Sequence, residues 1–252
     1  MTFDVAAEAY DRFMGRYSRL LSPLFADFAG VVAGSRALDV GCGPGALTGE
    51  LVSRLGAGSV AAVDPSEPFV EAARARHPGV EVHHASAEAL PFEAAAFDVT
   101  LAQLVVHFMA DPVAGLAEMR RVTRSGGVVA ACVWDFVGGA APLSLFWEVV
   151  RELDPRAVDE SHLAGARRGY LRELFTAAGL REVEETSLSV ERGHASFEEW
   201  WEPYTAGVGP AGTYVRSLGP EPQRELRDRC RARLPDGPFS LVSRAWAARG
   251  LV

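Results

Sequence analysis

Three glycines at alternate positions directly follow an apolar segment of this sequence. They are Gly41, Gly43 and Gly45, with Cys42 between the first two, and the apolar segment is residues 36–40. Glycine lets a backbone turn tightly and approach a ligand without a clash from Cβ. The pattern after residue 45 predicts a helix, and the free amides at a helix start can face a polar or anionic group. We therefore expect a ligand-binding turn here, and not an ordinary strand-to-helix connection.

The spacing of these glycines differs from that of the dinucleotide motif G-x-G-x-x-G. The third glycine comes one residue early, and Ala46 occupies the sixth position. Pro44 has no N–H to donate to a phosphate. Asp39 places a negative charge near the turn, which disfavours a pyrophosphate and suits a cationic group. An NAD-dependent oxidoreductase is thus an alternative function, but one that this turn argues against.

An aspartate ends the next apolar segment. Asp64 follows residues 59–63, and a carboxylate at this place can accept hydrogen bonds from both hydroxyls of a ribose, as it does in NAD enzymes. The competing interpretation is a helix cap for the helix expected from Pro68, a role that Ser66 can fill as well. Because a glycine turn precedes it, we favour ribose binding for Asp64, with Pro65 packing on the adenine face.

Two further runs extend the pattern and carry a family resemblance. Residues 84–92 read His-Ala-Ser-Ala-Glu-Ala-Leu-Pro-Phe, and residues 97–108 read Phe-Asp-Val-Thr-Leu-Ala-Gln-Leu-Val-Val-His-Phe. Together with residues 38–45 and Asp64, they resemble the motifs of class I S-adenosylmethionine-dependent methyltransferases. The group that they resemble most includes the ubiquinone and menaquinone biosynthesis methyltransferases. The resemblance spans residues 36–134 and is weak at both ends of the chain.

This resemblance implies S-adenosylmethionine as the cofactor and S-adenosylhomocysteine as the product. The Ser86 hydroxyl or the Ala87 amide would contact the adenine, because Ser86 stands where the family usually has an aspartate. Glu88 is either part of this end of the site or a surface acid. Gln103 and Leu104 would face the amino acid end of the cofactor.

Three further residues, His107, Tyr10 and Arg16, allow both a functional and a structural interpretation. His107 would lie near the transferred methyl group, as a general base or as a packed core histidine. Tyr10 and Arg16 resemble the N-terminal helix that covers the cofactor in this group. Arg16 would then pair with the methionine carboxylate, unless it is a solvated residue on an amphipathic helix.

The order of apolar and helical segments predicts the fold. We expect strands at 36–40, 59–63, 80–84, 97–101, 128–134, 180–192 and 240–248. Helices are expected at 46–55, 68–76, 112–123, 143–153, 170–178 and 221–234, with a turn at 125–127 and a glycine-rich break at 207–212. This alternation indicates an α/β fold: a Rossmann-like, doubly wound, mostly parallel seven-stranded sheet, with helices on both faces and a C-terminal lid insertion.

We expect one domain over residues 1–252. Residues 1–35 would cover the cofactor, 36–134 would bind it, and 135–252 would supply the substrate pocket and the last strands. Trp147, Trp200, Trp201 and Tyr204 would line that pocket, or else belong to the core or a dimer contact. The sequence has no H-E-x-x-H or similar cluster, so we predict no metal.

The composition of the chain limits the classes of binding partner that we expect. The formal net charge is −8, which argues against nucleic acid. No apolar run reaches the ~18 residues of a membrane span, and three cysteines without C-x-x-C spacing fit a cytoplasmic protein. The expected partner is a small-molecule methyl acceptor with an O, N or C nucleophile, and a homo-oligomer stays open. A non-catalytic cofactor-binding protein of the same fold is a further alternative.

Overall fold

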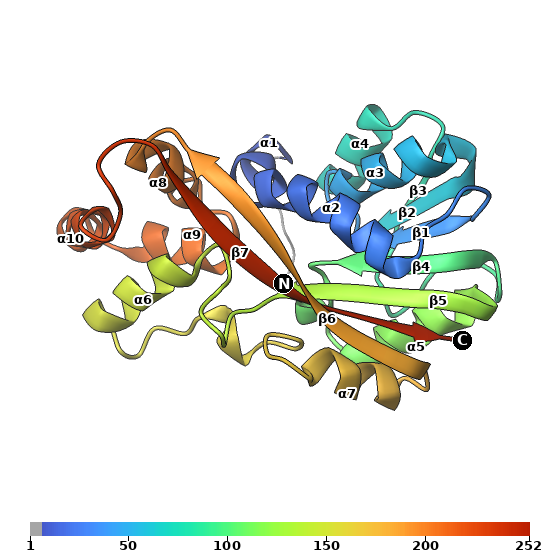
Figure 1. The fold of residues 1–252 in the computed structure, drawn as a ribbon. Coiled ribbons are helices and arrows are strands. Elements are labelled where there is room, and N and C mark those ends of the chain that lie inside the picture. Colours follow the sequence, from blue (N-terminus) through green and yellow to red (C-terminus); the bar gives the residue numbers. More distant parts are fainter. Residues whose placement is uncertain (1–6) are drawn as a thin grey trace.

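The structure is a computed structural model that describes residues 7–252, and its centre is a single sheet (Figure 1). The strand order is β3-β2-β1-β4-β5-β7-β6. The strands are β1 (Ala37–Val40), β2 (Val60–Asp64), β3 (Glu81–His84), β4 (Phe97–Gln103), β5 (Thr123–Trp134), β6 (Arg181–His194) and β7 (Phe239–Leu251). The strands β1 to β5 run parallel to one another, and β7 runs antiparallel to both β5 and β6. This confirms the predicted Rossmann-like, mostly parallel seven-stranded sheet.

Helices cover both faces of the sheet, with α2 and α3 on one side and α5 and α7 on the other (Figure 1). Their bounds are α1 (Ala7–Tyr10), α2 (Arg16–Ala29), α3 (Ala46–Leu55), α4 (Glu67–Arg76), α5 (Pro112–Val122), α6 (Ser144–Leu153), α7 (Tyr170–Ala177), α8 (Phe197–Thr205), α9 (Gly209–Ser217) and α10 (Pro220–Arg231). Successive strand residues point to opposite faces. Accordingly, Ala37 packs in the cluster that contains Leu47, and Leu38 in the one that contains Leu116.

The direction of chain progression reverses between β1 and β4, which are neighbours in the sheet. In open parallel sheets, ligands bind at such a switch point, outside the carboxyl ends of the strands. The segments that follow β1, β2 and β4 therefore meet at one edge. They include the glycine turn, Asp64 and the short 3₁₀ turn η3 (Val106–Phe108).

The last two strands extend beyond the sheet as a two-stranded ribbon. β7 pairs with β5 only from Val128↔Leu251 to Trp134↔Ala245, whereas its pairing with β6 continues to His194↔Phe239. The ribbon leads to α8, α9 and α10, which are inserted between β6 and β7, and α6 lies at the same end (Figure 1). The molecule thus has a sheet end and a helical end, joined by β6 and β7.

Two local expectations are wrong. The glycine-rich break expected at 207–212 reaches only residue 208, because α9 begins at Gly209, where Pro210 suits a first helical turn and Ala211 and Val215 are buried. A Cβ on Gly212 would lie 2.7 Å from the Gly207 carbonyl carbon, so this glycine permits a close backbone approach. The turn at 125–127 is an irregularity inside β5.

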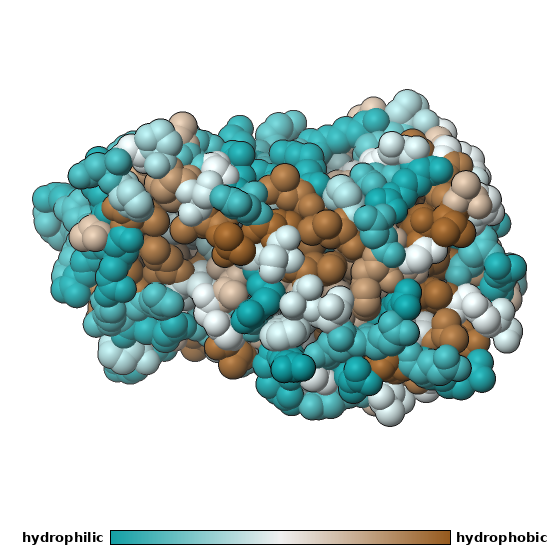
Figure 2. All heavy atoms as spheres, in the orientation of Figure 1, coloured by the Kyte–Doolittle hydropathy of each residue, from teal (hydrophilic) through white to brown (hydrophobic). Residues whose placement is uncertain are grey.

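Hydrophilic residues cover both ends of the face seen in Figure 2, and apolar ones gather near its middle. Over residues 7–252, the structure has no helix that is both long enough and apolar enough to span a membrane.

Candidate functional site

The glycine turn is fixed to the end of the neighbouring strand by backbone hydrogen bonds. The amides of Gly41 and Cys42 both donate to the Val63 carbonyl oxygen, at 2.8 and 2.9 Å. The Gly43 amide donates to Asp64 Oδ2 at 2.8 Å. The two loops that the sequence singled out therefore form one structural unit.

Two of these glycines are required by their surroundings. Gly41 has φ +71°, and a Cβ there would lie 2.5 Å from the methyl groups of Val105. Gly45 has φ +96°, and a Cβ would lie 2.7 Å from the ring of His77, whose Nε2 is 2.9 Å from the Gly45 carbonyl oxygen. Other residues are strained at such φ values even where space is available.

The Asp64 carboxylate accepts a hydrogen bond from each of the two loops and keeps lone pairs that a ligand could use. Its Oδ1 accepts from the Ser66 amide at 2.8 Å, as Oδ2 does from Gly43, and each oxygen keeps a further lone pair. Burial raises the pKa of Asp64, and the two backbone hydrogen bonds oppose that shift. The residue at the N-cap position of α4 is Ser66, so capping does not account for Asp64.

A cavity of about 250 Å³ opens beside these loops. It brings together most of the predicted cofactor-binding residues: Tyr10, Gly41, Gly43, Asp64, Pro65, Ser86, Ala87, Glu88, Gln103 and Leu104. The sequence reasoning missed other residues of the lining: Ser66, Phe69, Val105, Phe108, Met109 and Ala110. Three of these, Ser66, Val105 and Phe108, directly follow a residue that was singled out, and this adjacency was the available signal. That the cavity residues bind a cofactor stays a prediction.

The end of β4 presents a strained backbone and an unused acceptor to this cavity. Leu104 has φ +63°, a conformation that a bulky side chain adopts only when its surroundings impose it. Gln103 donates from Nε2 to the Ser18 carbonyl oxygen at 3.2 Å and to Ser22 Oγ at 3.0 Å. Its Oε1 is buried and has no hydrogen-bond partner among residues 7–252. A ligand with a donor group would satisfy this oxygen.

Glu88 is a lining residue and connects two loops. Its Oε1 accepts from the amides of Ala110 and Asp111, at 2.9 and 3.3 Å. Because these contacts tie the loop after β3 to the segment after η3, Glu88 shapes the wall of the cavity.

Four predicted cofactor-binding residues lie outside this lining. Arg16 donates to the Glu199 carbonyl oxygen at 3.1 Å, in a separate, charged depression. Asp39 is buried beneath the glycine turn, where Thr48 Oγ1 donates to it at 2.6 Å. Cys42 points into the core, and Gly45 contacts His77. Their predicted roles toward the cofactor would therefore be indirect.

His107 lines a second, smaller cavity of about 40 Å³. This cavity shares Tyr10, Leu104 and Phe108 with the first one. Burial lowers the pKa of His107 to about 3, so its imidazole is neutral near pH 7. The base role predicted for it stays a prediction.

The four aromatic residues of the C-terminal part lie in a packed cluster. Trp147, Trp200, Trp201 and Tyr204 are all buried, and Phe146 stacks on Tyr204 with ring centroids 4.7 Å apart. None of the four lines either cavity. They form the core of the helical end.

Comparison with known proteins agrees with this geometry. Residues 38–131 match the family model described as a methyltransferase domain. Over 162 residues the chain is 33% identical to a ubiquinone biosynthesis O-methyltransferase of Rhizobium johnstonii, covering 62% of this chain and 64% of that protein. A solved structure from Anaeromyxobacter dehalogenans, titled a putative type II methyltransferase, has a TM-score of 0.62 at 27% identity, covering 92% of this chain and 95% of that one.

These matches assign residues 38–131 to the methyltransferase domain family and, together with the fold, support a class I S-adenosylmethionine-dependent methyltransferase. A phosphoethanolamine N-methyltransferase of Haemonchus contortus, solved with S-adenosylhomocysteine, has the same fold. Its TM-score to this methyltransferase is 0.57 at 15% identity, covering 96% of this chain and 59% of that one. The chain spans between 31% and 64% of the length of the curated relatives that it matches at 33% identity or more.

Proposed function

We propose that this protein transfers a methyl group from S-adenosylmethionine to an oxygen, nitrogen or carbon nucleophile of a small molecule. The observation that carries the proposal is the position of the Asp64 carboxylate, which lines the same cavity as the glycine turn and Gln103. These groups match the chemistry of a ligand with a ribose at its centre and an ammonium at one end.

The residues present fit such a ligand. Asp64 would accept from the ribose hydroxyls, and Pro65 and Phe69 would flank the base. Ser86 and Ala87 would meet the adenine edge. Gln103 Oε1, which has no partner within the described residues, would accept from the ammonium group. The Asp64 carboxylate and the unpartnered Gln103 oxygen would then each have a counterpart in the ligand.

When bound, S-adenosylmethionine supplies an electrophilic methyl group and its own leaving group. The protein's task is therefore to position an acceptor and to exclude water. The second cavity adjoins the first through Tyr10, Leu104 and Phe108, and an acceptor placed there would lie next to the cofactor.

The test is calorimetric titration of the purified protein with S-adenosylhomocysteine and, separately, with NAD. We expect S-adenosylhomocysteine to bind and NAD to bind far more weakly. Asp64→Asn should lower the affinity for S-adenosylhomocysteine by about tenfold or more, because charge-assisted hydrogen bonds to the ribose are lost.

The matched control is Asp228→Asn, the same change on the exposed face of α10, which should leave the affinity unchanged. A preference for NAD, or no binding of S-adenosylhomocysteine, would refute the proposal. Binding without release of S-adenosylhomocysteine from S-adenosylmethionine in the presence of a broad set of small acceptors would favour a non-catalytic protein.

A further inference from the structure

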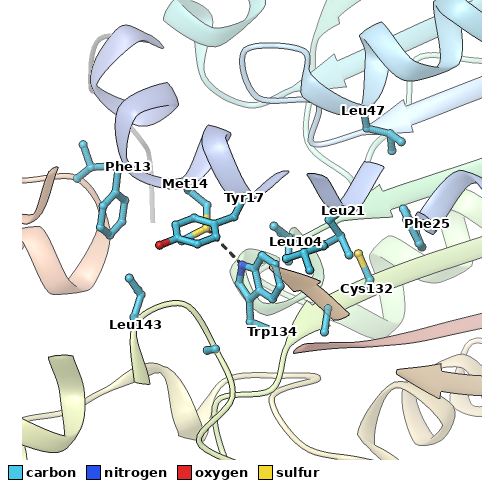
Figure 3. Packing of buried hydrophobic residues seen from close by; sticks show 14 of the residues in the cluster. Phe13, Met14, Tyr17, Leu21, Phe25, Leu47, Leu104, Cys132, Trp134 and Leu143 are labelled. Carbon is cyan, nitrogen blue, oxygen red and sulfur yellow. Dashed lines mark hydrogen bonds between the residues drawn. The ribbon is translucent and has the colours of Figure 1, made fainter. Parts of the chain in front are cut away.

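The second cavity has an unusual lining for so small a space. Three of its walls come from segments far apart in the chain: the N-terminal helical segment, the end of β5 with its following loop, and the start of α9. Figure 3 shows Phe13, Met14, Leu104, Trp134 and Leu143 of this lining. Trp134 Nε1 donates to Met14 Sδ at 3.3 Å, so the indole's only polar atom is already used. These walls offer apolar and aromatic contact.

Glu160 is the acidic exception in this lining. It begins the short turn η4 (Glu160–His162) and is 3% exposed. Its Oε2 has no hydrogen-bond partner within residues 7–252. A buried carboxyl oxygen without a partner costs free energy, and buried ionisable groups with a perturbed pKa gather at functional sites more often than elsewhere.

The neighbouring acid is fully engaged and does not share this role. Asp159 Oδ1 accepts from the amide and the hydroxyl of Ser161, at 3.0 and 2.6 Å, and Asp159 forms an ion pair with Arg151. Because Asp159 fixes the start of η4, the Glu160 side chain is held at the cavity.

The pKa values of Glu160 and His107, which both line this cavity, are shifted in opposite directions. Burial raises the pKa of Glu160 to about 7, with Trp147 opposing the shift. Burial lowers the pKa of His107 to about 3. A base is most useful when its pKa lies near the working pH, so the carboxyl is better matched to accept a proton at neutral pH than the imidazole. His107 Nδ1, also without a partner in the described chain, is free to orient a polar group.

We propose that this cavity and the adjoining part of the first one, which meet at Tyr10, Leu104 and Phe108, form the acceptor pocket, that the acceptor is an apolar or aromatic molecule with one hydroxyl group, and that Glu160 binds this hydroxyl and takes its proton. The inference rests on the proposed function, since it places the hydroxyl beside the cofactor cavity. An ammonium group would also suit Glu160, but it would have to lie near the sulfonium in a water-poor site, where like charges repel strongly.

The step balances without a further reactant. The acceptor oxygen forms a bond to the methyl carbon, and the bond from that carbon to sulfur breaks with its electron pair remaining on sulfur. The hydroxyl proton goes to the Glu160 carboxylate. The sulfonium cation becomes a thioether, the hydroxyl compound becomes a methyl ether, and the Glu160 carboxylate becomes a carboxylic acid. The positive charge on sulfur and the negative charge on Glu160 are thus both neutralised.

Binding, and not turnover, provides the test. Phenol and toluene have similar shapes and differ in the hydroxyl, so both are titrated into the complex with S-adenosylhomocysteine and followed by ligand-observed NMR. We expect phenol to bind about tenfold or more tightly than toluene, because a site built around a hydroxyl discriminates against the analogue that lacks it. Glu160→Gln should reduce this preference at least about fivefold.

Glu148→Gln is the matched control, because Glu148 is exposed on α6 and should leave the preference intact. S-adenosylhomocysteine should bind all three proteins equally, which verifies that each is folded. Equal binding of phenol and toluene, no binding of phenol, or an unchanged preference in Glu160→Gln would overturn the acceptor assignment while leaving the proposed function in place. Failure to bind S-adenosylhomocysteine would instead count against the proposed function.

Discussion

The two cavities are built in different ways. The larger one is formed mainly by segments that follow β1, β2, β3 and β4, and Tyr10 of α1 is the described lining residue that comes from elsewhere. The smaller one draws its lining from the N-terminal helical segment, η3, β5, η4 and α9. In the first, the ends of the strands determine most of the geometry. In the second, the geometry depends on how distant helices pack on the ribbon of β6 and β7.

This difference explains why the two sites differ in how far a sequence reveals them. Glycines with positive φ and acids at strand ends are local requirements, and they leave a local pattern. Glu160 lies in an irregular segment, and nothing near it in the sequence marks it as buried. Its environment exists only after the chain has folded.

The largest effect should follow from opening the aromatic cluster of the helical end. Phe146 is fully buried and stacks on Tyr204, so Phe146→Ala should lower the free energy of unfolding by about 3–5 kcal/mol. At a temperature where the variant is folded, its affinity for S-adenosylhomocysteine should stay within about threefold of the wild type. Thermal unfolding and calorimetry measure the two quantities.

The same experiment tests whether the two ends unfold together. Phe175→Ala removes an equally buried ring, on α7 at the sheet end. Because β7 pairs with strands of both ends, each variant should show one cooperative transition. Two separate transitions in Phe146→Ala alone would show that the helical end is an independent unit.

A smaller loss should come from the glycine turn, and there it should affect binding. In Gly41→Ala, the positive φ and the contact with Val105 together should cost about 2–3 kcal/mol of stability. The affinity for S-adenosylhomocysteine should fall by about tenfold or more. Adding Val105→Ala should recover part of both losses.

Gly34→Ala separates the two causes, since Gly34 has φ +88° with no atom within 4 Å of the added Cβ. It should cost about 1 kcal/mol and leave the affinity unchanged. If Gly34→Ala weakened binding as much as Gly41→Ala, the contact with Val105 would not matter.

The last expected effect is a pH dependence of the free energy of unfolding, and its cause is Asp39, which is buried beneath the same turn. Burial raises the pKa of Asp39 to about 7, although Thr48 donates a hydrogen bond to it. The folded state then binds more protons than the unfolded state between about pH 4 and pH 7, so Asp39 makes the protein less stable as the pH rises through this window. Asp39→Asn should therefore gain stability over the wild type by about 2 kcal/mol more at pH 8 than at pH 5. Chemical denaturation at both pH values measures this, and a difference that grows toward low pH would contradict it.

Much of the sheet end followed from the sequence, because hydrophobic periodicity and strand-end residues determine it. The seven strands of a mostly parallel sheet, the long β6 and the loops around Asp64 agree with expectation. The start of α9 did not, since glycines at 207–212 suggest a break unless the packing of Gly212 against Gly207 is known. Arg16 has the residue type for a carboxylate partner, but the helix that carries it turns it toward Glu199.

The position of β7 also determines the order in which the fold can be completed during synthesis. Among the described strands, β6 pairs only with β7, which leaves the ribosome later and after α8, α9 and α10. Until then β6 is an unpaired edge, open to pairing with another nascent chain. Its acidic residues, Glu182, Glu184, Glu185 and Glu191, would oppose such pairing by repulsion, so a strand that helps to carry the helical end also protects the growing chain from aggregation.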